Sequence, residues 1–270
     1  MEHEEVVYEI DGAVGLVTLN RPQYRNAQSW KLLDELDAAL DRAVADDAVR
    51  VVVVSGAGGN FSSGHDLGTP EQRADQEARG IPDQGGRFYE NFRKYNLEYT
   101  LKWRNLPKPT IAMVEGYCIY GGWMIAAAMD LLFASPDALF LAGLLEYFSI
   151  PWDVHPRKAK ELVFESRFIT AEEAREIGFV NRIYPSAELR RETLAFATRA
   201  AESGRMALLM SKLAINKAWD LQGYSATMEA AFSDYVVMMQ NAGVRGVEGE
   251  RRLGGVDLAL RGLRGERPGL

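Results

Sequence analysis

The stretch EGYCIYGGWMIAAAMDLLFAS, residues 115–135, carries the signal that decides the fold. Two adjacent glycines, Gly121 and Gly122, are followed directly by the apolar run WMIAAAM. This run is too short to cross a membrane and too apolar for a surface helix, so it predicts a buried helix. The glycines indicate that the first turn of this helix, where backbone N–H groups are unpaired, requires bare backbone.

Strand and helix signals alternate on both sides of this stretch. Strands are predicted at residues 6–10, 14–20, 50–56, 110–114, 131–134, 138–142 and 179–183, and helices at 29–45, 87–104, 156–164 and 171–176. The run RVVVVSG at 50–56 is apolar on both faces, so helices should cover both sides of its sheet. The predicted class is therefore α/β. The polar segment 69–86, rich in Gly and Pro, is predicted to be a loop.

The last third of the chain has a different pattern. Residues 187–241 are helical throughout by pattern, and Gly204 and Gly223 divide them into three helices. The tail 243–270 mixes Gly, Arg and Glu and is predicted to be loosely ordered. We therefore expect a core at residues 1–186 and a C-terminal helical region with its tail at 187–270.

Composition excludes several classes of function. The formal net charge of −7 gives no support to binding of nucleic acid or of an anionic membrane. The single cysteine, Cys118, excludes an intramolecular disulfide and is predicted to be a small buried hydrophobe. The acidic N-terminus differs from a signal peptide, so we expect a cytoplasmic protein. The three histidines are far apart in the sequence, and no metal site is predicted.

Two glycine-bearing turns are candidates for binding a ligand through backbone N–H groups. The first turn, SGAGGNFSSGHDL at 55–67, lacks the third glycine of a dinucleotide-binding turn and the Gly-Lys-Ser/Thr of a P-loop. Its small residues, Ser62, Ser63 and Gly64, let backbone N–H groups point into open space. The second turn places Gly121 at a helix N-terminus, where the dipole is positive. Two such donors aimed at one point form an oxyanion hole.

Four segments in this order resemble the crotonase superfamily, the enoyl-CoA hydratase/isomerase fold, and the resemblance covers nearly the whole chain. Its segments are RPQYRNAQS at 21–29, FSSGHDL at 61–67, KPTIAMVEGYCIYGG at 108–122 and ITAEEAREIGFVNRIYP at 169–185. The resemblance implies a crotonase-like ββα-superhelix core with a C-terminal helical trimerisation region. It also implies that the protein processes an acyl-CoA thioester and forms a homo-oligomer, either a trimer or a dimer of trimers. Coenzyme A enters as part of the substrate, and no other cofactor is implied.

The resemblance also assigns site residues. The backbone N–H groups of Ser63 and Gly121 would hold the thioester oxygen, and Arg25 would lie near the CoA phosphates or adenine. Further substrate contacts are expected from Ala27, Gly64, His65, Asp66, Leu67 and Tyr117. Asp66 is expected to order its loop through hydrogen bonds to backbone. His65 is either a group that donates or accepts a hydrogen bond near the site or a structural histidine.

The chain departs from the family at both positions that carry glutamates in family hydratases. The position three residues after the oxyanion glycine is Met124, and the second position, counted without gaps, is Leu144. The two-carboxylate arrangement that adds water across an enoyl double bond is therefore absent at the aligned positions. Trp123 and Met124 are instead expected to line a bulky, apolar acyl pocket.

One carboxylate remains close to these positions. Glu146 lies in the apolar stretch AGLLEYF at 142–148, where burial would suit it to general acid–base chemistry. A buried structural hydrogen bond is the alternative role for Glu146. Other polar groups nearby in sequence are Tyr117, Tyr120, Tyr147, Asp153 and His155.

The predicted function is an acyl-CoA enzyme that stabilises a thioester enolate, with Ser63, Gly121 and Glu146 as catalytic groups. It is not expected to be a standard two-glutamate hydratase. Isomerisation, C–C bond hydrolysis, decarboxylation and thioester hydrolysis all remain compatible with one base. A non-catalytic acyl-CoA binder is the alternative from another class.

Overall fold

The computed structural model describes residues 4–82, 85–142, 145–242 and 255–266 of the chain. Its main sheet has six strands in the order β1-β2-β3-β4-β6-β9. β1 and β2 are antiparallel, and every pair from β2 to β9 is parallel. These strands are Val6–Asp11, Val14–Leu19, Val51–Gly56, Thr110–Val114, Leu131–Ala134 and Arg182–Ile183. A three-stranded sheet joins β5 (Tyr117–Ile119), β7 (Leu139–Leu141) and β8 (Ile169–Thr170).

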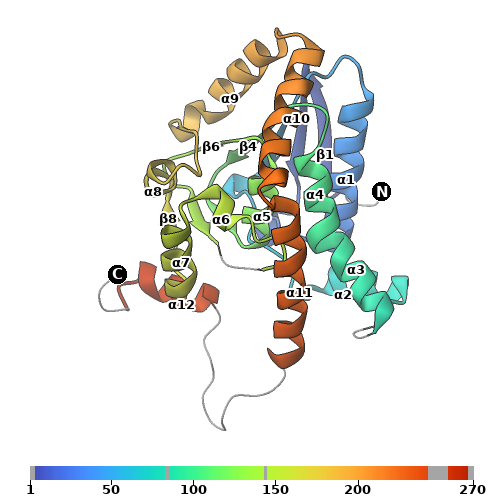
Figure 1. Cartoon of the computed structure of the whole chain (residues 1–270), viewed down its shortest axis with the longest axis vertical. Helices are drawn as coiled ribbons and strands as arrows, with labels where there is room; N and C mark the ends of the chain where they lie inside the picture. Colours follow the sequence, from blue (N-terminus) through green and yellow to red (C-terminus); the bar gives the residue numbers. More distant parts are fainter. Residues whose placement is uncertain (1–3, 83–84, 143–144, 243–254, 267–270) are drawn as a thin grey trace.

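Helices surround both sheets (Figure 1). They are α1 Trp30–Ala45, α2 Pro70–Arg79, α3 Gly86–Arg93, α4 Tyr99–Arg104, α5 Gly121–Ala128, α6 Ile150–Asp153, α7 Pro156–Glu165, α8 Ala171–Glu176, α9 Ser186–Ala201, α10 Arg205–Leu221, α11 Tyr224–Ala242 and α12 Gly255–Leu263. Short 3₁₀ turns lie at Pro22–Tyr24 and Ala57–Gly59, and a π-helical turn, Lys94–Glu98, joins α3 to α4. The predicted α/β class is confirmed.

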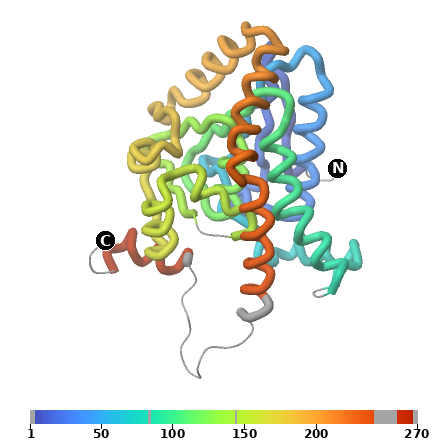
Figure 2. The backbone as a smooth tube through the Cα atoms, viewed as in Figure 1, coloured from blue at the N-terminus to red at the C-terminus, as the bar shows by residue number. Residues whose placement is uncertain are grey.

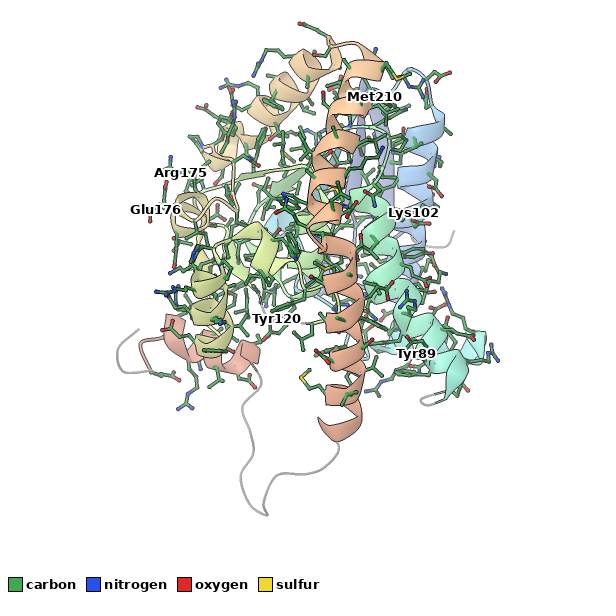
Figure 3. All side chains as sticks on the ribbon, viewed as in Figure 1. Tyr89, Lys102, Tyr120, Arg175, Glu176 and Met210 are labelled. Atoms are coloured by element: carbon green, nitrogen blue, oxygen red, sulfur yellow. The ribbon has the colours of Figure 1, made fainter. Side chains whose placement is uncertain are left out.

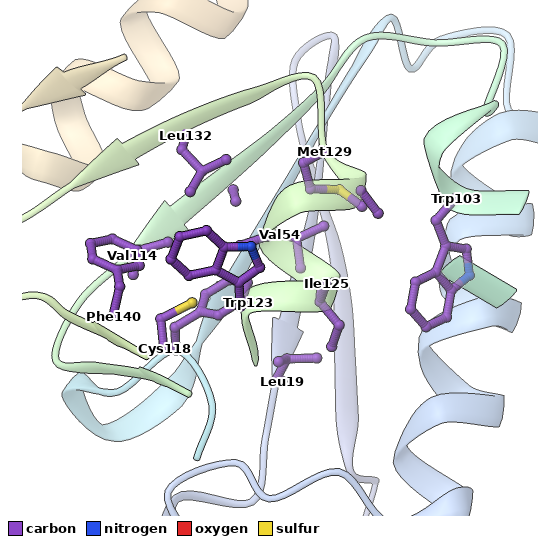
Figure 4. Packing of buried hydrophobic residues seen from close by; sticks show 14 of the residues in the cluster. Leu19, Val54, Trp103, Val114, Cys118, Trp123, Ile125, Met129, Leu132 and Phe140 are labelled. Carbon is purple, nitrogen blue, oxygen red and sulfur yellow. The ribbon is translucent and has the colours of Figure 1, made fainter. Parts of the chain in front are cut away.

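The apolar strand β3 is buried on both faces, as its sequence predicts. Val52 and Val54 pack in the cluster that contains α1 and α5, whereas Val51 and Val53 pack in the cluster that contains α9. Adjacent side chains of a strand point to opposite faces, so four successive valines supply two cores. Figure 4 shows Val54 beside Trp123 of α5.

Two expectations for the polar and terminal segments are wrong. Residues 70–79 form a helix, α2, because Thr69 caps its N-terminus, Pro70 occupies the first turn and Gly80 ends it in the left-handed conformation. In the tail, α12 is helical and packs Ala259 into a small core. Figures 1 and 2 show α12 beside α7. The strand expected at 179–183 is limited to β9, and the tail residues 243–254 lie outside the described residues.

The C-terminal helices divide at the two glycines named by the sequence. Gly204 precedes α10, and Gly223 lies between α10 and α11. Met228 and Phe232 of α11 pack against Leu97 of the π-helical turn. Within the described residues, no helix combines the length and the apolar character that a membrane span requires.

Candidate active site

The first turn of α5 places an unpaired donor beside strand β5. Tyr120, which precedes the helix, has φ 46° and ψ −100°, a sparsely populated conformation for a residue with a side chain. Gly121 follows as the first helical residue, so its N–H has no acceptor within α5. It donates to no other residue that the structure describes.

Close packing explains both glycines. A Cβ added at Gly121 would lie 2.6 Å from Nδ1 of His65, and one added at Gly122 would lie 2.7 Å from the carbonyl oxygen of Ser62. Side-chain carbons do not approach other atoms so closely. Bare backbone therefore lets the 62–65 loop pack directly onto the first turn of α5.

The unpaired amide of the 62–65 loop belongs to His65, whereas the Ser63 amide, which the resemblance assigns to the thioester oxygen, is already hydrogen-bonded. The Ser63 N–H donates to the carbonyl of Arg25 (2.9 Å), and the Gly64 N–H lies 3.2 Å from Oγ of Ser62. The His65 N–H has no hydrogen-bond partner among the described residues.

Strand-like pairing explains why the His65 amide has no hydrogen-bond partner. Gln28 donates its N–H to the carbonyl of Gly64 (2.8 Å) and accepts the N–H of Asp66 (3.0 Å). In such parallel pairing, the residue between the two bonded ones points its N–H to the opposite side. His65 is that residue.

Glu146 and the His65 side chain lie together. Nε2 of His65 is 3.8 Å from Oε2 of Glu146 and 2.5 Å from Oδ1 of Asn96. The Glu146 side chain is 3% exposed, and its Oε2 is buried without a hydrogen-bond partner. Nδ1 of His65 is likewise buried and unpartnered. Two unpaired polar atoms in one place are rare in a folded protein and mark a place where a ligand group or water can bind.

Tyr235 of α11 faces the same carboxylate. Burial, followed by the charge of Glu146 and a hydrogen bond to it, raises the pKa of the Tyr235 phenol well above its usual value. Asn96 and Tyr235 were not among the predicted site residues. Asn96 is a polar position among the aromatic residues of the predicted 87–104 helix, such as Phe92, Tyr95 and Tyr99, and this pattern is the sequence signal that could have identified it.

Asp66 orders its loop, as predicted. It accepts hydrogen bonds from the N–H groups of Gly68 and Thr69 and lies 2.8 Å from Nη1 of Arg21. Although burial acts to raise its pKa, the hydrogen bonds from Thr69, Arg21 and Gly68 hold the pKa of Asp66 below its usual value.

The other residues expected to bind substrate lie at different depths. Arg25 is exposed, with its guanidinium 5.5 Å from the ring centre of Tyr117. Ala27 is buried, and its carbonyl accepts a hydrogen bond from Arg21. Leu67 is 97% exposed.

The bulky residues of α5 pack into apolar cores. Trp123 stacks on Phe179 at 3.7 Å and donates its indole N–H to Asp153. Met124 is buried in the cluster that contains Leu97 and Tyr147. Figure 4 shows the Trp123 ring among apolar core residues. Leu144, the second position compared with family hydratases, lies outside the described residues.

The family model described as "Enoyl-CoA hydratase/isomerase" matches residues 9–249. The chain belongs to the enoyl-CoA hydratase/isomerase family. The resemblance to the crotonase superfamily is thus confirmed, and the chain is an acyl-CoA enzyme of this family.

Named relatives agree with this assignment. A putative enoyl-CoA hydratase of Mycobacterium tuberculosis is 39% identical over 254 residues, which span 86% of this chain and 79% of the relative. The crystal structure of a probable enoyl-CoA hydratase from Mycobacterium thermoresistibile matches with a TM-score of 0.81 at 39% identity. The match covers 89% of this chain and 96% of that chain. A solved enoyl-CoA hydratase/isomerase from Xanthobacter autotrophicus Py2 has a TM-score of 0.78 at 31% identity, covering 91% and 95%.

Proposed function

We propose that this enoyl-CoA hydratase/isomerase family member stabilises a thioester enolate between the amides of His65 and Gly121. The observation that carries the proposal is that both N–H groups are unpaired on adjoining segments. A Cβ added at Gly64, next to His65, would lie 3.5 Å from the Gly121 nitrogen. Fixed donors of this kind stabilise negative charge that develops on an oxygen, typically by about 3 kcal/mol for each donor.

Glu146 supplies the acid–base group of this proposal. It is the carboxylate beside His65, its Oε2 lacks a hydrogen bond, and Met124 occupies the position of a hydratase glutamate. Single-base reactions fit this arrangement better than two-glutamate hydration. These reactions are isomerisation, C–C bond hydrolysis, decarboxylation and thioester hydrolysis. A non-catalytic acyl-CoA binder would keep the two amides and show no turnover with any acyl-CoA.

Acetoacetyl-CoA tests the oxyanion hole, because it forms an enolate far more readily than a saturated thioester. Binding should raise the absorbance of the enolate at a pH where the free compound is mostly in the keto form. Free CoA at equal concentration is the control for nonspecific changes. Tight binding without this spectral change would contradict enolate stabilisation.

Crotonyl-CoA tests the departure from the hydratase pattern. Hydration should be slower than roughly 10 per second, a typical turnover of metabolic enzymes, because Met124 cannot activate water. Faster hydration would show that the chain contains an acid–base pair suited to adding water.

The proposed enzyme is a homo-oligomer, a trimer or a dimer of trimers. Large apolar side chains are exposed on α10 and α11, among them Met206 (66%), Met210 (48%) and Met238 (47%). Figure 3 labels Met210 on α10. Exposed apolar patches of this kind mark interfaces. Light scattering at micromolar concentration should report a multiple of the 30.1 kDa chain, and a monomer would refute the assembly.

A further inference from the structure

We propose that the His65 imidazole, with Asn96 and Glu146 behind it, removes the proton from the carbon next to the thioester carbonyl. The inference rests on the proposed function and deepens it, because it assigns removal of the α proton to His65 and leaves the other proton transfers of the reaction to Glu146. Its basis is the position of the ring between the first turn of α5 and the buried carboxylate.

Asn96 fixes which nitrogen of His65 carries a proton. The Asn96 amide nitrogen donates to the carbonyl of Phe92 (2.7 Å), so its oxygen is the atom that faces His65. An oxygen of this kind only accepts, so Nε2 of His65 must donate. Neutral His65 then has a bare Nδ1, which is the basic nitrogen.

The π-helical turn helps to place Asn96. Asn96 lies within Lys94–Glu98 and is 2% exposed. A π-helical turn accommodates one extra residue and thereby changes the direction of the side chains that follow, and such turns are frequent at functional sites. The unusual turn and the His65 contact therefore occur at the same residue.

The bare nitrogen lies close to Gly121, whose amide belongs to the proposed oxyanion hole. A Cβ added at Gly121 would lie 2.6 Å from Nδ1 and 2.7 Å from Cε1 of His65, so this edge of the ring lies against the residue whose amide would bind the thioester oxygen. The reacting carbon is bonded to the carbonyl carbon. We therefore infer that a thioester held by the Gly121 amide has its α carbon within reach of Nδ1.

Glu146 then acts through His65. Once Nδ1 has taken a proton, the ring is a cation, and Oε2 of Glu146 lies 3.8 Å from Nε2. A buried carboxylate at this distance stabilises the imidazolium without itself being protonated, as a carboxylate does behind a catalytic histidine.

The step balances. The bond between hydrogen and the α carbon breaks, the proton passes to Nδ1, and the electron pair forms the enolate, whose charge rests on the thioester oxygen. The reverse step returns a proton from Nδ1 to the carbon. The His65 side chain is 20% exposed whereas Nδ1 itself is buried, so exchange of this proton with solvent requires water to reach the ring.

Exchange of the α hydrogens with D₂O measures this step without knowledge of the natural substrate. The wild-type protein should incorporate deuterium at the α carbon of butyryl-, octanoyl- or lauroyl-CoA, detected by mass spectrometry. His65→Gln keeps the backbone amide and removes the base, so it should slow exchange by about a hundredfold or more. His155→Gln changes an exposed histidine at the start of α7 and is the matched control with wild-type exchange.

A pH profile separates a base from a structural histidine. Asn96→Asp places a carboxylate against Nε2, favours the charged ring, and should move the pH midpoint of exchange upward. Wild-type exchange rates in His65→Gln, or an unmoved midpoint in a folded Asn96→Asp variant, would overturn the role of His65. Wild-type protein that binds these thioesters without exchanging them would overturn it too, whereas absence of any thioester binding by calorimetry would overturn the proposed function itself.

Discussion

Glu146 and Asp153 are two acidic residues of one short segment, and their carboxylates differ in hydrogen bonding. Asp153 accepts hydrogen bonds at the same oxygen from Ser149 (2.6 Å) and from the indole of Trp123 (3.1 Å). Oε2 of Glu146 is buried without a hydrogen-bond partner beside the ring of His65, whereas neither oxygen of Asp153 is both buried and unpartnered. Withdrawal of a carboxylate from water therefore does not identify a catalytic group. An unsatisfied oxygen next to another unsatisfied atom is the more informative sign.

Asp153 also shows how burial changes the pKa of a hydrogen-bonded carboxylate. Burial raises its pKa to about 6, although the hydrogen bonds from Ser149 and Trp123 act in the opposite direction. Ionisation of Asp153 near neutral pH therefore lowers the free energy of unfolding. We therefore expect Glu146 to affect turnover and Asp153 to affect the pH dependence of stability.

Glu146→Gln is expected to have the largest effect. The variant keeps the shape and removes the charge, so turnover of an acyl-CoA substrate should fall by about a hundredfold or more while CoA binding stays nearly unchanged. The free energy of unfolding should stay equal or rise, because a buried carboxylate with one oxygen that lacks a hydrogen bond is lost. Steady-state kinetics measure the turnover, and urea unfolding measures the free energy of unfolding. Unaltered turnover would remove Glu146 from the mechanism.

Asp153→Asn should instead change the pH dependence of stability. The unfolded carboxyl titrates near its ordinary value of 3.8 and the folded one at about 6, so between these pH values the folded state holds the extra proton. The free energy of unfolding of the wild type should therefore fall as pH rises through this window, by up to about 3 kcal/mol.

The asparagine variant lacks this contribution and should become more stable relative to the wild type from pH 4 to pH 7. Its turnover should remain close to the wild-type value. Urea unfolding across this pH range gives the comparison. Parallel curves for the two proteins would show that Asp153 does not titrate there.

Ser149→Ala removes a donor from Asp153 and should cost about 2 kcal/mol of unfolding free energy at pH 7, where the carboxylate is ionised. The cost should be smaller at pH 4, because the protonated acid needs this donor less. An equal cost at both pH values would contradict a role for Ser149 in holding the charge. Thermal unfolding of the wild type and the variant at the two pH values measures these costs.

Tyr235→Phe should have the smallest effect. It removes a hydroxyl that hydrogen-bonds to Glu146, worth roughly 1 kcal/mol, so turnover should fall by about fivefold. Tyr89→Phe is the matched control, since the Tyr89 ring is exposed at the edge of α3 (Figure 3). A loss as large as that of Glu146→Gln would make Tyr235 itself a candidate proton carrier.

Elements with local sequence signals could be predicted from the residues alone. The valines of β3 predict a strand buried on both faces, and the hairpin β1–β2 and the cap of α1 at Ser29 follow from their own residues. Gly121 and Gly122 before an apolar run predict α5. The helix α2 was predictable too, because Thr69, Pro70 and Gly80 are ordinary start and stop signals that the polar composition obscured.

The tertiary structure alone decided which groups meet. Whether the Ser63 or the His65 amide is free depends on the pairing with Gln28, a contact between segments that no local pattern encodes. Asn96 and Tyr235 reach His65 and Glu146 from two separate helical elements, and their distances in sequence say nothing about these contacts. Local residues specify local structure through propensity and periodicity, whereas a site is made where several elements converge, and only their packing fixes its geometry.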